Sequence, residues 1–207
     1  MEVLLAFAAA LLALRLGGLL AARWRARRAP ELAAWGAALV TYAVASAALA
    51  WGSAAGWDAR AFRVYYLFGG LLTAPLLGAG SLLLWSRYAA GPVALLYTGL
   101  AVGIATAVPV HGSFDSGIPA AQDHLDFVPA RLVALVGNSL GTLAVLVVAA
   151  ATFRRRPLGN TLIVLGVAIA AVGSALAGLG ASSTAAFAAA GVVVLYAGFT
   201  MRVRTSS

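Results

Sequence analysis

Residues 3–22 read VLLAFAAALLALRLGGLLAA, and residues 23–30 behind them read RWRARRAP. A helix of about 20 residues is about 30 Å long, which matches the hydrocarbon core of a bilayer. The cluster of arginines marks the point where the chain leaves that core. Because Met1-Glu2-Val3 lacks the basic region of a secretory signal peptide, we interpret this segment as a retained first membrane span.

The composition of this segment extends over the whole chain. Of the 207 residues, 63% are hydrophobic and 10% are charged, whereas soluble domains carry roughly 45–50% apolar and about 25% charged residues. A water-soluble fold is therefore excluded. Lipid-facing backbone must satisfy its own hydrogen bonds, and barrel strands alternate instead of forming continuous apolar runs. We therefore expect an all-α integral membrane protein.

Seven apolar runs bounded by charge, proline or glycine predict one domain over residues 1–207, a seven-helix transmembrane bundle. The runs are residues 3–22, 31–51, 62–86, 92–111, 130–152, 158–180 and 184–201. Four prolines are expected at or just before helix starts, where the missing amide donor costs little. They are Pro30, Pro92, Pro129 and Pro157. Pro75 lies inside the third run and should kink that helix, with Thr73 able to bond a freed carbonyl.

Arginine placement predicts the orientation. Ten arginines follow the first, third, fifth and seventh runs and share their side of the membrane with one carboxylate, Glu31. They are Arg23, Arg25, Arg27, Arg28, Arg87, Arg154, Arg155, Arg156, Arg202 and Arg204. The positive-inside rule places this side in the cytoplasm, with the N terminus outside and the C terminus inside. Despite a sequence pI of about 11.1, we assign this charge to topology and anionic lipid, and expect no nucleic-acid partner.

Two basic loops end in proline, Arg27-Arg28-Ala29-Pro30 and Arg154-Arg155-Arg156-Pro157. Both precede helices that would run in the same direction, which admits a 3+1+3 arrangement of two parallel three-helix units joined by the fourth span. The absence of lysine beside abundant alanine, leucine and arginine suggests a GC-rich bacterial genome. The expected location is the bacterial cytoplasmic membrane.

The residue types that the chain lacks exclude several functions. Without lysine it cannot form a retinal Schiff base, and without cysteine it has neither disulfides nor thiolate sites. No Asp or Glu lies well inside a run, whereas proton-coupled pumps and transporters commonly use such a group as a relay. We expect no cofactor.

Polar side chains inside the runs are the best pointers to function, because each costs free energy unless it is paired or hydrated. Helical spacings of three and four, or of seven and four, align such residues on one face of the third and fifth runs. The candidate ligand-binding residues are Arg63, Tyr66, Thr73, Tyr97, Arg131, Asn138 and Thr142. For Asn138 an interhelical hydrogen bond and a ligand contact both remain open, and Gly137 and Gly141 would permit the close helix approach that the first requires.

The longest connection, about residues 112–129, joins the fourth and fifth runs. It and its edge carry two imidazoles and three carboxylates, His111, Asp115, Asp123, His124 and Asp126. Such groups can hold a zinc ion that activates water, and in ingredients alone they resemble seven-helix membrane hydrolases of the ceramidase and adiponectin-receptor type. The alternatives are a hydrated loop whose carboxylates pair with Arg60, Arg63 and Arg131, or a lid over an outward-facing pocket.

A further resemblance lies in the first half of the chain. Arg28, Pro30, Tyr66-Leu67, Pro75, Leu82-Leu83-Leu84, Tyr88 and Gly91 resemble the seven-helix sensor region that precedes some bacterial histidine kinases. The resemblance stops at Gly91, and we expect no kinase domain in this chain. It implies a receptor-like membrane module whose output needs a separate signalling protein or a second copy of the chain.

Three functions follow from these patterns. The first is a stand-alone sensor that binds a small ligand from the outer side. The second is a transporter or channel for a small neutral or anionic solute, and the third is a metal-dependent hydrolase at the outer face. Only the third would make the protein an enzyme.

Overall fold

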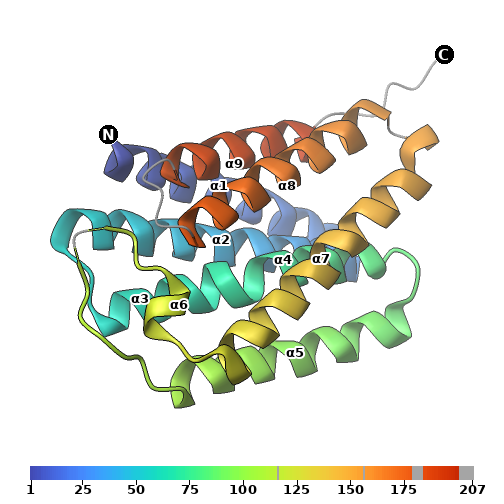
Figure 1. Ribbon diagram of the computed structural model, residues 1–207. Coiled ribbons are helices and arrows are strands. Elements are labelled where there is room, and N and C mark those ends of the chain that lie inside the picture. Colours follow the sequence, from blue (N-terminus) through green and yellow to red (C-terminus); the bar gives the residue numbers. More distant parts are fainter. Residues whose placement is uncertain (116, 156, 179–183, 201–207) are drawn as a thin grey trace.

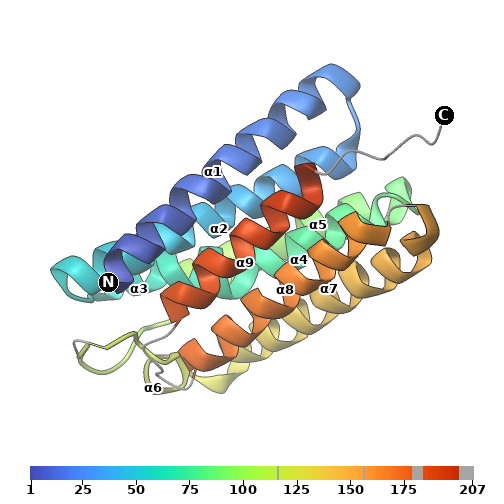
Figure 2. The same cartoon turned by 90° about the horizontal axis from the view of Figure 1, so that it is seen from above.

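The computed structural model describes residues 1–115, 117–155, 157–178 and 184–200. All regular structure in these ranges is helical, and no strand occurs in them. The long helices are roughly aligned along one axis, and the chain runs back and forth along it. The N terminus lies at the same end of the bundle as the short helix α6 (Figures 1 and 2). We refer to this end as the α6 end. Arg202 and Arg204 lie outside the described residues.

The helices follow the apolar runs expected from the sequence, with shifts of a few residues at their ends. In chain order they are α1 (Glu2–Arg27), α2 (Pro30–Ala55), α3 (Ala59–Tyr65), η1 (Tyr66–Leu72), α4 (Thr73–Leu82), α5 (Arg87–Ala107), α6 (Ala121–His124), η2 (Phe127–Arg131), α7 (Leu132–Ala151), η3 (Phe153–Arg155), α8 (Pro157–Gly178) and α9 (Thr184–Thr200). The segments α3, η1 and α4 form one continuous rod.

Five helical segments of the described chain are long and apolar enough to cross a membrane. They are Glu2–Arg27, Pro30–Ala55, Ala59–Leu82, Arg87–Ala107 and Phe127–Ala151. Two further apolar stretches, Pro157–Gly173 and Thr184–Thr200, are shorter, in the range of 10–17 residues. The prediction of an all-helical protein of membrane type is confirmed.

Prolines mark most helix starts as predicted. Pro30 and Pro157 are the first residues of α2 and α8, and Pro129 lies in the short helix η2, which leads into α7 at Leu132. The expectation for Pro92 is wrong, because α5 begins at Arg87 and Pro92 lies inside it. The hydrogen bond that Pro92 cannot make belongs to the first turns of α5, near Tyr88, which is 96% exposed, so the surroundings can satisfy the carbonyl.

A wide turn precedes the proline inside the third rod. Residues Tyr66–Leu72 form a π-helix, and α4 resumes at Thr73. Thr73 Oγ1 donates a hydrogen bond of 2.7 Å to the carbonyl of Phe68, and it lies 3.1 Å from Thr41 Oγ1 on α2. As predicted, Thr73 bonds a carbonyl upstream of Pro75, and the distortion takes the form of a π-bulge.

Small residues set the distance between α4 and α7. A Cβ placed on Gly78 would lie 2.5 Å from the Cα of Gly141, and a Cβ on Gly141 would meet the carbonyl of Ala74. At the other end of α7, Asn160 of α8 is buried and its Nδ2 donates to the carbonyl of Ala149 and to Thr152 Oγ1. These contacts hold α7 against α4 near its middle and against α8 near its last turn.

Candidate functional site

A cavity of about 530 Å³ lies in the half of the bundle nearest to the α6 end. Its walls come from α2, the α3–η1–α4 rod, α7, α8 and α9, and Pro119 and Ala121 of the connection between α5 and α7 cover part of it. Most lining side chains are apolar. The volume falls within the range of about 300–1,000 Å³ that small-molecule sites occupy.

The wall from α7 and the last residue of η2, Arg131, carries three of the predicted ligand-binding residues. Arg131, Asn138 and Thr142 all line the cavity, because spacings of seven and four return to one face of a helix. The guanidinium of Arg131 lies 5.6 Å from the centre of the Phe127 ring. No ion pair joins Arg131 to a carboxylate of the described residues.

The wall from the third rod carries two more predicted residues, Tyr66 and Thr73. The hydroxyl of Thr73 is used within the protein, as described above. The hydroxyl of Tyr66 has no hydrogen-bond partner among the described residues, and neither has that of the adjacent Tyr65, which also lines the cavity. Two phenol groups are therefore available to a bound molecule.

Asn138 links the two walls. Its Nδ2 donates a hydrogen bond of 2.8 Å to the carbonyl of Gly70, within the π-helix. In a π turn the donor for that carbonyl would be five residues further along, and this position is Pro75, which has no N–H. The side-chain oxygen of Asn138 is buried and has no partner in the described part of the chain. The predicted interhelical bond is present, and the residue also lines the cavity.

The other two predicted ligand-binding residues, Arg63 and Tyr97, do not line this cavity. Arg63 Nη1 donates a 2.6 Å hydrogen bond to the carbonyl of Ala105, near the end of α5. The hydroxyl of Tyr97 donates to the carbonyl of Val133 at 3.3 Å. The π-helix explains the position of Arg63, because a wider turn breaks the periodicity that would have aligned it with Thr73. Both side chains instead satisfy backbone groups of neighbouring helices.

Part of the site carries little signal in the sequence. The walls from α8 and α9 consist largely of small and aliphatic residues such as Val167, Ala171 and Ala188, which resemble any other membrane-helix surface. Tyr42 contacts this side, since its hydroxyl donates to the carbonyl of Ala188 at 2.7 Å. Ser46 and Thr142 line the cavity with hydroxyls that have no hydrogen-bond partner among the described residues.

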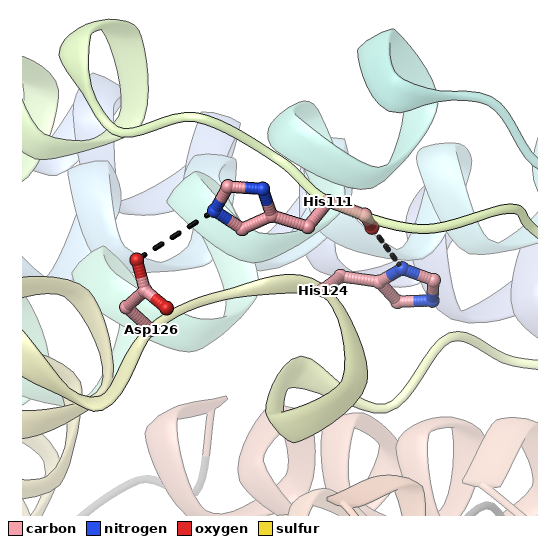
Figure 3. A network of polar contacts seen from close by, with 3 residues as sticks. All are labelled: His111, His124 and Asp126. Carbon is pink, nitrogen blue, oxygen red and sulfur yellow. Dashed lines mark hydrogen bonds and ion pairs between the residues drawn. The ribbon is translucent and has the colours of Figure 1, made fainter.

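Hydrogen bonds between His111 and His124 link the two ends of the connection between α5 and α7 (Figure 3). The backbone N–H of His111 donates to the carbonyl of His124 at 3.0 Å, and Nδ1 of His124 lies 2.8 Å from the carbonyl of His111. Because a carbonyl only accepts, Nδ1 must carry the proton. The His124 ring is buried and stacks on Phe114, with ring centres 4.4 Å apart.

The five candidate metal ligands do not come together. Among the described residues no three His, Asp or Glu side chains are placed to hold one ion. His111 Nε2 lies 3.6 Å from Asp126 Oδ2, where both side chains are more than half exposed, and the pair is the one ion pair found in the described ranges. The alternative of carboxylates paired with Arg60, Arg63 and Arg131 is therefore not realised either. The loop does lie over the cavity, through Pro119 and Ala121.

Comparison of the chain with protein-family models, with curated proteins and with solved structures found no match. The described lining contains hydroxyls, one amide and one guanidinium, but no carboxylate and no imidazole. This set can bind and orient a molecule through hydrogen bonds and one positive charge.

Proposed function

We propose that this chain is a seven-helix sensor of the bacterial cytoplasmic membrane, which binds a small ligand from the outer side. The observation that carries the proposal is the 530 Å³ cavity. Tyr65, Tyr66, Ser46 and Thr142 line it, and their hydroxyls have no hydrogen-bond partners among the described residues. Polar groups left unpaired within a membrane protein are costly, and a ligand that bonds them recovers that cost.

The proposed topology counts α8 and α9 as spans beside the five segments named above as long and apolar enough to cross a membrane. Both helices are apolar, and they lie alongside α1 and α7 in the bundle (Figures 1 and 2). The α6 end would face outward, because Arg27, Arg87 and Arg154 all lie at helix ends on the opposite side. In the most apolar window of α5 only 11% of the residues are buried, which agrees with the linking role of the fourth span in the 3+1+3 arrangement.

Sensing is favoured over transport because the other half of the bundle is closed. Leu77 and Leu195, which line this end of the cavity, belong to a buried cluster that continues through Val145 and Phe199. The Gly78–Gly141 contact brings α4 and α7 together at the same level. Output would then pass as a helix shift to the basic inner loops and from there to a partner protein or a second copy.

Ligand-dependent thermal stabilisation of the purified protein tests the proposal. A panel of small polar solutes, carboxylates and amphiphiles is compared on wild type, Tyr66→Phe and Asn138→Leu, with Ser139→Leu as the matched control because Ser139 is exposed on α7. We expect a stabilising compound whose effect falls in the first two variants and persists in the control. If every stabilising compound acts equally on all four proteins, the cavity is not the binding site.

Proteoliposomes separate sensing from transport. For any compound that binds, the sensor proposal predicts binding without flux into vesicles that hold the protein alone. Concentrative or facilitated uptake that requires the protein would instead establish a carrier or channel.

A further inference from the structure

We infer that the ligand is a single-chain amphiphile with a carboxylate or phosphate head group, taken up from the outer leaflet of the bilayer. This inference rests on the proposed function, because it names the ligand class of the same cavity. Four features of the cavity carry it: its charge, its length, its volume and the place where it opens.

The charge of the cavity is positive at one end. Arg131 is the only lining residue that carries a formal charge within the described chain, and it has no carboxylate partner there. A guanidinium group carries a positive charge and presents a fork of donors that fits carboxylate and phosphate oxygens. Tyr66 lines the same cavity, so its unpaired hydroxyl can add a further donor. An anionic head group would satisfy both residues.

The length of the cavity matches one leaflet. Lining residues extend along α7 from Arg131 to Thr142 and along α9 from Thr184 to Leu195. At a rise of 1.5 Å per residue, eleven residues span about 16 Å. This is about half the thickness of the hydrocarbon core, which is the depth that the chain of one lipid occupies. Between these limits the lining is mostly apolar, with Leu135 and Ala188 on facing walls.

The volume suits one chain better than two. A cavity of about 530 Å³ lies in the lower half of the range of about 300–1,000 Å³ that small-molecule sites occupy. A single acyl chain with its head group is a molecule of that size class, and a phospholipid with two chains has more than twice as many non-hydrogen atoms. The occupant is therefore a molecule of the fatty-acid or alkyl-phosphate kind.

We place the opening of the cavity between α7 and α8, which lie side by side in Figure 2, because lining residues of both helices are exposed there. Leu135 of α7 lines the cavity and is nevertheless 59% exposed, and Ala171 of α8 also lines it and is exposed. At their other ends the two helices are held together by Asn160. An opening on the lateral surface of a membrane helix bundle faces lipid, so an amphiphile can enter without crossing water.

Binding of four probes to the full chain in nonionic detergent tests the inference. The probes are oleate, oleyl phosphate, oleyl alcohol and acetate, so that head-group charge and chain are varied separately. We expect oleate, oleyl phosphate or both to bind at least tenfold more tightly than oleyl alcohol, and acetate to show no binding. Whichever anion binds more tightly identifies the head group. Oleyl alcohol binding as tightly as both anions, or acetate binding as tightly as oleate, would overturn the inference.

Two variants, with one control substitution, test whether the probes bind in the cavity. Arg131→Gln should weaken the anionic probes roughly tenfold and leave oleyl alcohol unchanged, while Arg60→Gln, an exposed arginine on α3 outside the cavity, should leave all probes unchanged. Ala171→Trp should slow or abolish oleate binding by filling the opening, and its position on the surface keeps the fold intact. Oleate binding that is unaffected by both Arg131→Gln and Ala171→Trp would overturn the assignment.

Failure of this inference is distinguishable from failure of the proposed function. If the amphiphiles do not bind but a polar solute binds and depends on Tyr66 and Asn138, the cavity is a ligand site of another class. If no probe or solute depends on any cavity residue, both proposals are wrong.

Discussion

The Nδ2 of Asn138 on α7 donates a 2.8 Å hydrogen bond to the carbonyl of Gly70 in the π-helix of the third rod. The bond crosses from one wall of the cavity to another. It supplies a donor at the place where Pro75 cannot, and it fixes the amide so that its oxygen has no partner among the described residues. One side chain thus stabilises the distorted helix and shapes the candidate site.

Replacing this side chain should cost stability. Asn138→Leu leaves the Gly70 carbonyl without its donor, and interhelical bonds of this kind contribute about 0.6 kcal/mol on average and up to about 1.7 kcal/mol. We expect a lower midpoint of thermal unfolding in detergent. Ser139→Leu, one position along the same helix and exposed, should have little effect. Equal stability of the two variants would show that the bond contributes nothing.

The glycines between α4 and α7 should not tolerate even a methyl group. Gly141→Ala places a Cβ against the carbonyl of Ala74, and such overpacking costs about 1–3 kcal/mol. Gly103→Ala on α5 is the matched control, because no atom lies within 4 Å of the added Cβ. There the better helix propensity of alanine should be neutral or stabilising by up to about 1 kcal/mol. Reversible unfolding in mixed detergent measures the change in the free energy of unfolding for each variant. A smaller loss of stability for Gly141→Ala than for Gly103→Ala would contradict the packing described.

The two histidines of the α5–α7 connection should differ in importance. His124→Ala removes a hydrogen bond to the His111 carbonyl and a ring stacked on Phe114, a loss of about 2 kcal/mol. His111→Ala removes a side chain that is more than half exposed and leaves the backbone bonds of His111 in place. Limited proteolysis of the connection, together with thermal unfolding, should report the first change and not the second. The reverse order would mean that the His111–Asp126 pair holds the loop.

The α5–α7 connection should not bind a metal ion. Elemental analysis of protein purified without chelators should find no stoichiometric zinc, because the described residues bring no three ligands together. His124→Ala would then leave metal content unchanged. One zinc per chain that is lost in both His111→Ala and His124→Ala would revive the hydrolase hypothesis.

Cysteine labelling tests the proposed topology, and the chain has no native cysteine to remove. Ser113→Cys in the α5–α7 connection should react with an impermeant maleimide in intact cells. Ala26→Cys and Arg154→Cys, both exposed at the opposite end, should react only after the membrane is opened. Labelling of all three from outside would reject the orientation.

The sequence by itself determined the helical elements, because their causes are local. Continuous apolar runs leave the helix as the structure that satisfies its own backbone, and Pro30 and Pro157 begin helices wherever those helices later pack. The spacing of Arg131, Asn138 and Thr142 likewise placed them on one face of α7, since that alignment needs only an undistorted helix.

Only the tertiary structure decided which of the polar residues meet. Arg63 and Tyr97 satisfy backbone carbonyls of neighbouring helices, and His124 stacks on Phe114 instead of joining a metal site. The apolar walls from α8 and α9 carry no mark in the sequence. Helical periodicity assigns a residue to a face, but glycine contacts and the π turn decide which neighbour that face meets, and these act between segments far apart along the chain.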